Sequence, residues 1–198
     1  MGGHNHWDKL SKQFDTHSTD EEIDSRVADN VLIAWPPIIE QMDKKFPDKK
    51  GLKAVDFGCG TGSFCSELHK LGFTVTGIDY SSEMVNVARK HSPKDITYIK
   101  GSFEQLTKPP KQDLVVSIMT LQFIEDIDKT MQHIATAIKP GGLLVFGVFN
   151  PEWVTQCLKA KVAFADFDSV DSPRIGMKTF GAVRLPVYIR TALEYDEA

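Results

Sequence analysis

The feature that most constrains this chain is a set of three alternating glycines, Gly58, Gly60 and Gly62, placed directly after a short β-rich segment at residues 54–57. Phe64, Leu68 and Leu71 follow at i, i+4 and i+7, which is the spacing of one helix face. Glycine permits a sharp turn and lets a ligand lie against bare backbone. The N–H groups that begin the next helix point toward that ligand. The pattern therefore predicts a strand, a ligand-binding turn and a helix.

The alternation of strand and helix continues to about residue 149. Further strands are predicted at residues 73–78, 96–99, 114–118 and 143–148, with helical stripes in the intervals that follow residues 81 and 126. Near-continuous apolar strands suit a sheet that is buried on both faces. Repeated βα units therefore predict an α/β fold, a doubly wound and mostly parallel sheet. We expect one domain: an N-terminal helical lid at 1–50, the core at 51–150 and a substrate-covering segment at 151–198.

Charge and composition exclude several classes of protein. The chain has 198 residues, with 23 Lys and Arg against 27 Asp and Glu, which gives a net charge of −4. Proteins that bind phosphate backbones usually carry a basic excess, so nucleic acid is disfavoured as a partner. The longest nearly continuous apolar run, 143–149, is too short to cross a membrane. Three cysteines without a CxxC pair indicate a reducing compartment and no zinc site, so we expect a cytoplasmic protein without a bound metal.

A second acid defines the ligand expected at the glycine turn. Asp79 ends the second predicted strand, where a carboxylate can accept both hydroxyls of a ribose. A dinucleotide site would read GxGxxG, whereas Ser63 stands here in place of the third glycine. Asp56, two residues before the first glycine, would repel a pyrophosphate and suit a cationic amino group. The charges therefore favour a nucleoside with an amino acid and a sulfonium over NAD.

Five segments then carry a resemblance to a known family. In order and spacing, VDFGCGTGSF, GIDYSSEM, GSFEQL, DLVVSIMTLQFIED and IKPGGLLVFGV resemble the successive motifs of the class I (seven-strand, Rossmann-like) S-adenosylmethionine-dependent methyltransferases. The resemblance covers about residues 51–149. It implies an enzyme that uses S-adenosylmethionine as cofactor and methylates a small-molecule acceptor. Two alternatives stay open: a nucleic-acid or protein methyltransferase, and a non-catalytic protein that binds the cofactor as a partner subunit.

The resemblance also assigns cofactor-binding roles to individual positions. Asp56 and the backbone around the glycine turn would hold the methionine part, and Asp79 would hold the ribose. Many relatives have Asp where this chain has Ser102, so the adenine amino contact would pass to a hydroxyl or to backbone here. The complete set of cofactor-binding residues that the resemblance implies is Asp56, Gly58, Cys59, Gly60, Asp79, Tyr80, Met84, Ser102, Phe103, Ile118 and Met119.

The C-terminal part of the pattern departs from the family. The family's sheet ends with an antiparallel hairpin of a sixth and a seventh strand. Here residues 185–198 resemble the segment that leads into the family's last helix, with a strand at 185–189 and a capping box that begins at Thr191. We therefore expect the family's last helix and its final hairpin of sixth and seventh strands to be missing from this chain, which would leave an edge of the sheet unpaired or covered by a neighbouring chain. The sequence is compatible with a homodimer.

The residues that contact the acceptor are less clearly marked, and no catalytic base is assigned. His17 is the first candidate for a base, with a plain surface histidine as the alternative. Phe14, Trp35, Trp153 and Tyr188 are candidates for an apolar lid, although each could serve packing alone. Arg190 could meet an anionic acceptor or a nearby carboxylate, and the resemblance implies that the chain at Gln122 passes by the methyl group. The acidic pair Glu125 and Asp126 is expected to begin a helix rather than bind a metal.

Overall fold

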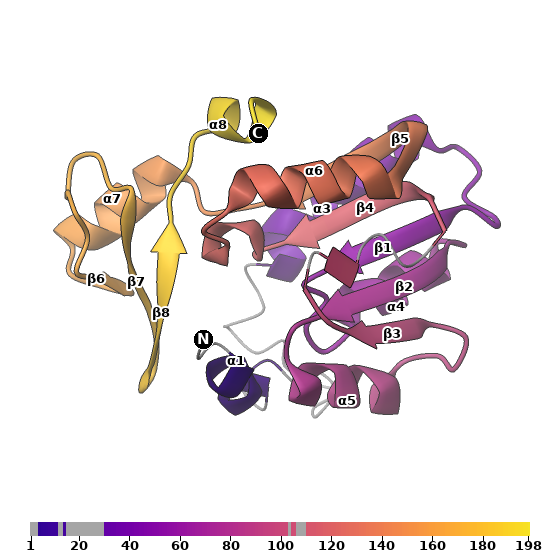
Figure 1. Cartoon of the computed structure of the whole chain (residues 1–198), viewed down its shortest axis with the longest axis horizontal. Coiled ribbons are helices and arrows are strands. Elements are labelled where there is room, and N and C mark those ends of the chain that lie inside the picture. Colours follow the sequence, from indigo (N-terminus) through magenta and orange to yellow (C-terminus); the bar gives the residue numbers. More distant parts are fainter. Residues whose placement is uncertain (1–3, 12–13, 15–29, 103, 106–109) are drawn as a thin grey trace.

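The fold is built on a five-stranded parallel sheet with the order β3-β2-β1-β4-β5 (Figure 1). The structure is a computed structural model that describes residues 4–11, 14, 30–102, 104–105 and 110–198. Every neighbouring pair of strands in this sheet is parallel. The predicted parallel α/β architecture is therefore confirmed. The strands are β1 (Lys53–Phe57), β2 (Thr74–Asp79), β3 (Thr97–Lys100), β4 (Gln112–Ile118) and β5 (Ile138–Gly147).

Helices cover both faces of this sheet, as expected of a doubly wound fold. On one face, α3 (Trp35–Lys45), α4 (Ser63–Lys70) and α5 (Ser82–His91) form an apolar cluster with Ala54, Val75 and Leu114 of the strands. On the other face, α6 (Ile127–Ala137) and α8 (Ala192–Asp196) pack against Val55 and Val115. Alternate residues of β1 thus enter different clusters, because successive side chains of a strand point to opposite faces. Asp56 consequently faces the α4 side.

Local side-chain signals fix where the helices begin. The Ser81 side chain accepts a hydrogen bond from the amide of Met84, and the Asp126 side chain accepts one from Lys129, so each caps the helix that follows. The expectation that the acidic pair at 125–126 begins a helix is confirmed. Thr191 forms a capping box with Glu194 at the start of α8, also as predicted.

A second, antiparallel sheet follows the central one in the chain. Asn150 caps α7 (Pro151–Lys159), after which β6 (Phe164–Ala165), β7 (Ile175–Phe180) and β8 (Val183–Tyr188) pair in the order β6-β7-β8. The sequence predicted only the last of these strands. Within the described residues the central sheet has five strands and ends at β5, whereas the chain also forms the antiparallel hairpin of β7 and β8 and the short helix α8. The hairpin of β7 and β8 does not extend the central sheet.

The N-terminal helices lie in two different places. Helix α1 (His4–Leu10) contacts α5 and β8, beyond the ends of the parallel strands (Figure 1). The π-helical segment η2 (Asn30–Ala34) leads into α3, whose Met42 is fully buried in the core cluster. In the described part of residues 1–50, α1 is therefore placed as a lid would be, whereas α3 forms part of the core.

Candidate functional site

The candidate site lies at the carboxyl ends of the parallel strands. In Figure 1 the arrowheads of β1, β2 and β4 point toward the side on which α1 and the β7–β8 hairpin lie. Helix α1 and the 3₁₀ turn η4 (Leu121–Phe123) both contact β8 across this side. In open α/β sheets, ligands bind outside the carboxyl ends of the strands, near the point where the strand order reverses. Here that point lies between β1 and β4.

The glycine turn adopts backbone conformations that residues with a side chain rarely adopt. Gly58, Gly60 and Gly62 have φ angles of 77°, 53° and 83°. The amides of Gly58 and Cys59 donate to the carbonyl of Ile78 at 2.8 and 3.1 Å, which fastens the turn to the end of β2. A Cβ at Gly58 would clash with Thr120, and one at Gly62 would clash with Tyr98, whereas a Cβ at Gly60 would meet nothing within 4 Å. Gly60 is therefore the point at which the turn presents open backbone.

Asp79, at the end of β2, closes this turn. Its carboxylate accepts hydrogen bonds from the amides of Gly60 at 2.9 Å and Ser81 at 2.8 Å. Burial raises the pKa of Asp79, while these backbone donors oppose the rise. The Tyr80 amide is a further backbone donor that lowers the pKa of Asp79. An ionised carboxylate offers about four acceptor positions, so these bonds leave acceptor capacity for a ribose hydroxyl, and the residues present fit a nucleoside.

The Asp56 side chain is buried on the α4 side of the sheet, beneath the glycine turn, and is not exposed at its surface. Its side chain is 2% exposed and accepts a hydrogen bond from the Cys65 thiol of α4 at 3.4 Å. Burial raises its pKa from 3.8 to about 7; the thiol hydrogen bond lowers it, and the charge of Asp79 raises it further. The structure thus gives Asp56 a packed, largely desolvated environment on the α4 side. Direct contact with the amino group of a methionine moiety stays a prediction.

The buried thiols of the turn and of α4 have little nucleophilic character. Contact with Cys65 and burial raise the pKa of Cys59, and burial raises the pKa of Cys65 to about 11. A thiol whose pKa is raised forms little thiolate at neutral pH, and the thiolate is the reactive form. The side chains of Cys59 and Cys65 therefore pack in the core cluster, and a cofactor contact of Cys59 stays a prediction.

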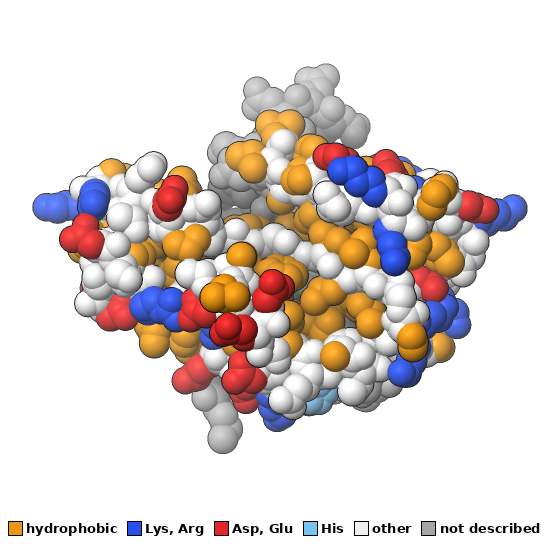
Figure 2. Space-filling model, turned by 90° about the horizontal axis from the view of Figure 1, so that it is seen from above, with side chains coloured by type: hydrophobic (Ala, Val, Ile, Leu, Met, Phe, Trp, Pro, Cys, Tyr) orange, Lys and Arg blue, Asp and Glu red, His pale blue; other side chains and the backbone are white. Residues whose placement is uncertain are grey.

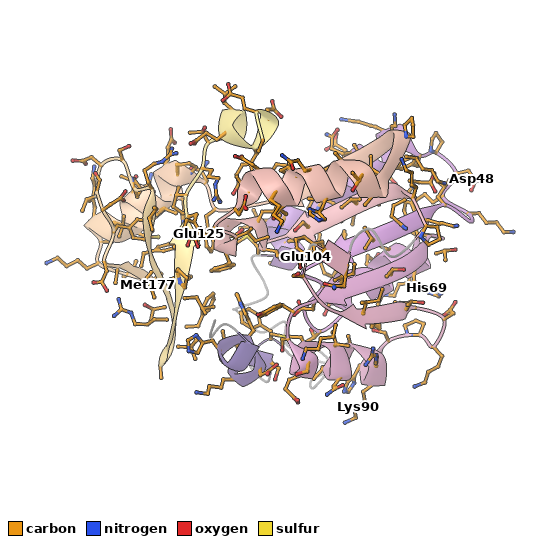
Figure 3. All side chains as sticks on the ribbon, in the orientation of Figure 1. Asp48, His69, Lys90, Glu104, Glu125 and Met177 are labelled. Atoms are coloured by element: carbon orange, nitrogen blue, oxygen red, sulfur yellow. The ribbon has the colours of Figure 1, made fainter. Side chains whose placement is uncertain are left out.

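The residues expected around the adenine are partly covered by other elements. Tyr80 is 39% exposed, whereas Met84 is buried in a cluster with Leu10 of α1 and Leu185 of β8. The Ser102 amide donates to the Gln105 side chain at 2.7 Å. Its hydroxyl bonds to Glu104, which Figure 3 labels near the ends of the strands. Phe103 lies outside the described residues.

The chain that leaves β4 is strained and carries an unsatisfied polar atom. Met119 follows Ile118 with a φ of 56°, unusual for a residue with a side chain, and its amide donates to the carbonyl of Gly147 at 2.7 Å. Gln122 is only 1% exposed; its Nε2 lies 3.9 Å from the Met119 sulfur, and its Oε1 has no hydrogen-bond partner. Strain of this kind and buried unpaired acceptors both occur preferentially at functional sites.

Aromatic side chains from separate elements meet between the core and the second sheet. The Trp7 ring lies 5.0 Å from that of Phe123, and Phe14 lies 5.7 Å from Phe180. We call this set the aromatic cluster: Trp7, Phe14, Phe123, Phe149, Trp153, Phe164 and Phe180. It includes two residues of the predicted lid, Phe14 and Trp153. The sequence analysis missed the others, although Phe123 and Phe149 follow closely on predicted strands.

The remaining predicted substrate residues lie elsewhere. Trp35 packs against Phe64 of α4, with ring centroids 5.0 Å apart, and the Tyr188 ring stacks under the Arg190 guanidinium at 5.2 Å. Trp35 and Tyr188 thus contact side chains outside the aromatic cluster. Their place in an apolar lid with Phe14 and Trp153 stays a prediction.

Arg190 is engaged with main chain rather than with a carboxylate. It donates to the carbonyls of Ile124 at 2.9 Å and Glu125 at 2.7 Å, beside the position where Figure 3 labels Glu125. These bonds tie the chain after β8 to the turn after β4. His17, the candidate base, lies outside the described residues.

Acidic side chains gather near the middle of the face that carries α6 and α8 (Figure 2). Exposed acids in these helices or just before them include Glu125, Asp128 and Asp196. In the described part of the chain, no three His, Cys, Asp or Glu side chains are grouped as a metal site would require. Across the same residues, no helix combines the length and apolar character needed to span a membrane.

Comparison with known proteins gives matches to one family. Residues 55–146 match the family described as methyltransferase domain. The ubiquinone biosynthesis O-methyltransferase of Bradyrhizobium sp. (strain ORS 278) is 30% identical over 111 residues, which make up 54% of this chain and 44% of that protein. The chain thus spans less than half the length of this curated relative.

Two solved structures are similar over more of the chain. An S-adenosylmethionine dependent methyltransferase from Mesorhizobium loti is 28% identical with a TM-score of 0.53, over 76% of this chain and 63% of that one. The PH0226 protein from Pyrococcus horikoshii OT3 has a TM-score of 0.70 at 20% identity, over 96% of this chain and 86% of that one. The second similarity concerns the fold alone, and it extends beyond the central sheet.

Proposed function

We propose that this chain, which belongs to the class I Rossmann-like S-adenosylmethionine-dependent methyltransferase family, binds S-adenosylmethionine at the glycine turn and methylates a small-molecule acceptor. The observation that carries the proposal is the closed turn itself. Gly60 presents open backbone there, and Asp79 keeps acceptor capacity beside it. Backbone around Gly58 and Gly60 would hold the methionine part, and Asp79 would hold the ribose.

The bound cofactor supplies an activated methyl group, so the protein has mainly to position the acceptor and to exclude water. The end of β4 and the chain that follows it, from Ile118 to Gln122, would line the part of the site in which the methyl group is transferred. Helix α1 supports the exclusion of water, since its Leu10 is fully buried against Met84 and Leu185. No described residue is assigned as a general base.

The choice of a small acceptor rests on two observations. The aromatic cluster provides apolar ring faces beyond the carboxyl ends of the strands, and flat rings suit apolar or aromatic ligands. The curated relative that matches the core is named a ubiquinone biosynthesis O-methyltransferase. We therefore propose transfer to an oxygen of a small molecule. A cytoplasmic location, a homodimer, the absence of a metal and the exclusion of nucleic acid stay predictions from the sequence.

Transfer of labelled methyl tests this function directly. The protein is incubated with methyl-labelled S-adenosylmethionine and a panel of catechols, phenols and small carboxylic acids, with a yeast RNA sample and an unfolded protein sample in parallel. We expect label in a small molecule and none in RNA or protein. Label in either macromolecule would contradict the small-molecule acceptor. Binding of S-adenosylhomocysteine without transfer to any sample would favour a non-catalytic cofactor-binding protein.

A further inference from the structure

We infer that Asp8 latches helix α1 over the proposed cofactor site, so that S-adenosylmethionine enters and its product leaves only when this latch opens. The inference rests on the proposed function and deepens it, because it assigns a residue that controls the passage of the cofactor. Helix α1 lies between α5 and the β7–β8 hairpin, across the carboxyl ends of the parallel strands (Figure 1).

The Asp8 carboxylate binds the first turn of α5. Its Oδ1 accepts a hydrogen bond from the Ser81 hydroxyl at 2.6 Å and one from the Glu83 amide at 3.2 Å. The first amides of a helix have no acceptor within the helix, and a carboxylate is favoured at this positive end. Asp8 therefore fastens α1 to α5 through a charged acceptor.

Ser81 connects this latch to the carboxylate that we assign to the ribose. Its amide donates to Asp79 at 2.8 Å, while its hydroxyl donates to Asp8. After burial, the charge of Asp8 is the next contribution that raises the pKa of Asp79. The latch therefore lies beside the proposed ribose position.

Two further contacts extend the same segment of chain across the site. The hydroxyl of Thr61, the residue after Gly60, donates to the Phe14 carbonyl at 3.0 Å. The Trp7 ring lies 5.0 Å from that of Phe123 in η4. The segment thus contacts the glycine turn, the start of α5 and the turn after β4. These are the elements to which we assign the methionine part, the ribose and the methyl transfer, so a cofactor held between them would leave only if the segment moved.

The position of α1 depends on such contacts because the helix is short. It has seven residues, and a helix of that length is not stable alone in water. Leu10 is fully buried against Met84 and Leu185, an apolar contact that has no preferred direction. The charge-assisted hydrogen bonds of Asp8, by contrast, require one position of α1 relative to α5. Loss of the Asp8 carboxylate should therefore loosen the lid while Leu10 keeps it attached.

The rates of binding and release of S-adenosylhomocysteine test the inference. They are measured by stopped flow on the full chain, in the wild type and three variants. Asp8→Ala removes the acceptor, Asp8→Asn keeps an oxygen that can accept the same hydrogen bonds, and Lys9→Ala is the control, a truncation of the neighbouring exposed side chain of α1. Hydrogen exchange of the α1 amides reports whether the helix opens, and thermal unfolding shows that each variant is folded.

Because the latch closes one path in both directions, Asp8→Ala should raise the association and dissociation rate constants together. We expect each to rise at least about tenfold, as the loss of hydrogen bonds to a charged group predicts, with the Kd changed by less than about threefold. Asp8→Asn and Lys9→Ala should keep both rate constants within about threefold of the wild type, since Asn also caps helices well. The α1 amides should exchange faster only in Asp8→Ala.

Three results would overturn the inference: rate constants in Asp8→Ala that match those of Lys9→Ala, α1 amides that exchange no faster in Asp8→Ala, or a weaker Kd with an unchanged association rate. The last result would make Asp8 a contact of the ligand and not of the lid. If S-adenosylhomocysteine does not bind the wild type, the proposed function fails and the inference fails with it. If it binds and its rates do not depend on Asp8, only the present inference fails.

Discussion

The Asp79 carboxylate accepts a hydrogen bond from the Gly60 amide at 2.9 Å, which joins the end of β2 to the turn that follows β1. This bond orients a half-buried carboxylate toward the one glycine of the turn that faces open space. Neighbouring parallel strands bring their carboxyl ends to the same edge of the sheet, so the pairing follows from topology. The cofactor site that we propose depends on this relationship.

Comparison of Gly60→Ala with Gly141→Ala separates the effect of a methyl group on ligand binding from its effect on backbone strain. Gly60 and Gly141 both have positive φ, at 53° and 77°, and a Cβ at either would meet nothing within 4 Å. Gly60→Ala and Gly141→Ala should each lower the free energy of unfolding by about 1–2 kcal/mol, the cost of a left-handed alanine. Only Gly60→Ala should weaken binding of S-adenosylhomocysteine, by at least about tenfold, because its methyl group enters the ligand space. Urea unfolding and calorimetry measure the two effects, and equal affinities of the two variants would disprove the assigned position of the ligand.

Burial of Asp56 predicts a specific dependence of stability on pH. Its folded pKa of about 7 lies above its ordinary value of 3.8, so between these pH values the folded state holds a proton that the unfolded state has lost. The free energy of unfolding therefore falls as the pH rises from 4 to 7, by up to about 4 kcal/mol at 1.4 kcal/mol per pH unit. Asp56→Asn should remove this contribution. Between pH 5 and pH 8 the free energy of unfolding should therefore fall more in the wild type than in Asp56→Asn. Urea unfolding at the two pH values gives the comparison; identical pH dependence in both proteins would refute a buried, proton-binding Asp56.

Arg190 is predicted to stabilise the fold and not to select the acceptor. Arg190→Gln loses the charged donor to the carbonyls of Ile124 and Glu125, and should lower the free energy of unfolding by about 1–3 kcal/mol. The control Arg184→Gln removes an exposed charge and should change it by less than about 0.5 kcal/mol. Denaturant unfolding measures both. A change no larger in Arg190→Gln than in the control would show that the two carbonyl contacts contribute nothing.

The central sheet could be predicted because its elements carry their own local signals. The glycine turn, the Ser81 cap and the Asp126 cap each act within a few residues, and the structure shows all three. Their order along the chain then implies the parallel sheet. The proposed cofactor site was visible for the same reason, since Asp79 ends a recognisable strand.

The second sheet was harder to predict because its packing partners are distant in sequence. β7 places Gly176 and Lys178 on its inner face, and both residue types are usual in turns or on the surface. A Cβ at Gly176 would clash with the Phe167 ring, and Lys178 lies among rings contributed by other elements, such as Phe149. Neither environment can be deduced from the strand's own residues.

Trp35 shows where local sequence signals stop. A large aromatic residue in the N-terminal segment suggested a lid, and in the structure it begins α3 and meets Phe64 of α4, directly after the glycine turn. The sequence favours contact between such a side chain and other apolar groups, and it does not show which ones. Only Phe14 and Trp153 of the predicted lid residues join the aromatic cluster.

Calorimetric titration with S-adenosylhomocysteine tests the central claim most directly, in the wild type, Asp79→Asn and the control Asp95→Asn. Asp95 is an exposed acid that pairs with His69. It lies just before the start of β3, at the opposite edge of the sheet from the glycine turn. We predict that Asp79→Asn binds at least about tenfold more weakly, since a charged acceptor of the ribose contributes about 1.5–3 kcal/mol, and that Asp95→Asn binds as the wild type does. Equal affinity of the wild type and a folded Asp79→Asn protein would contradict the account.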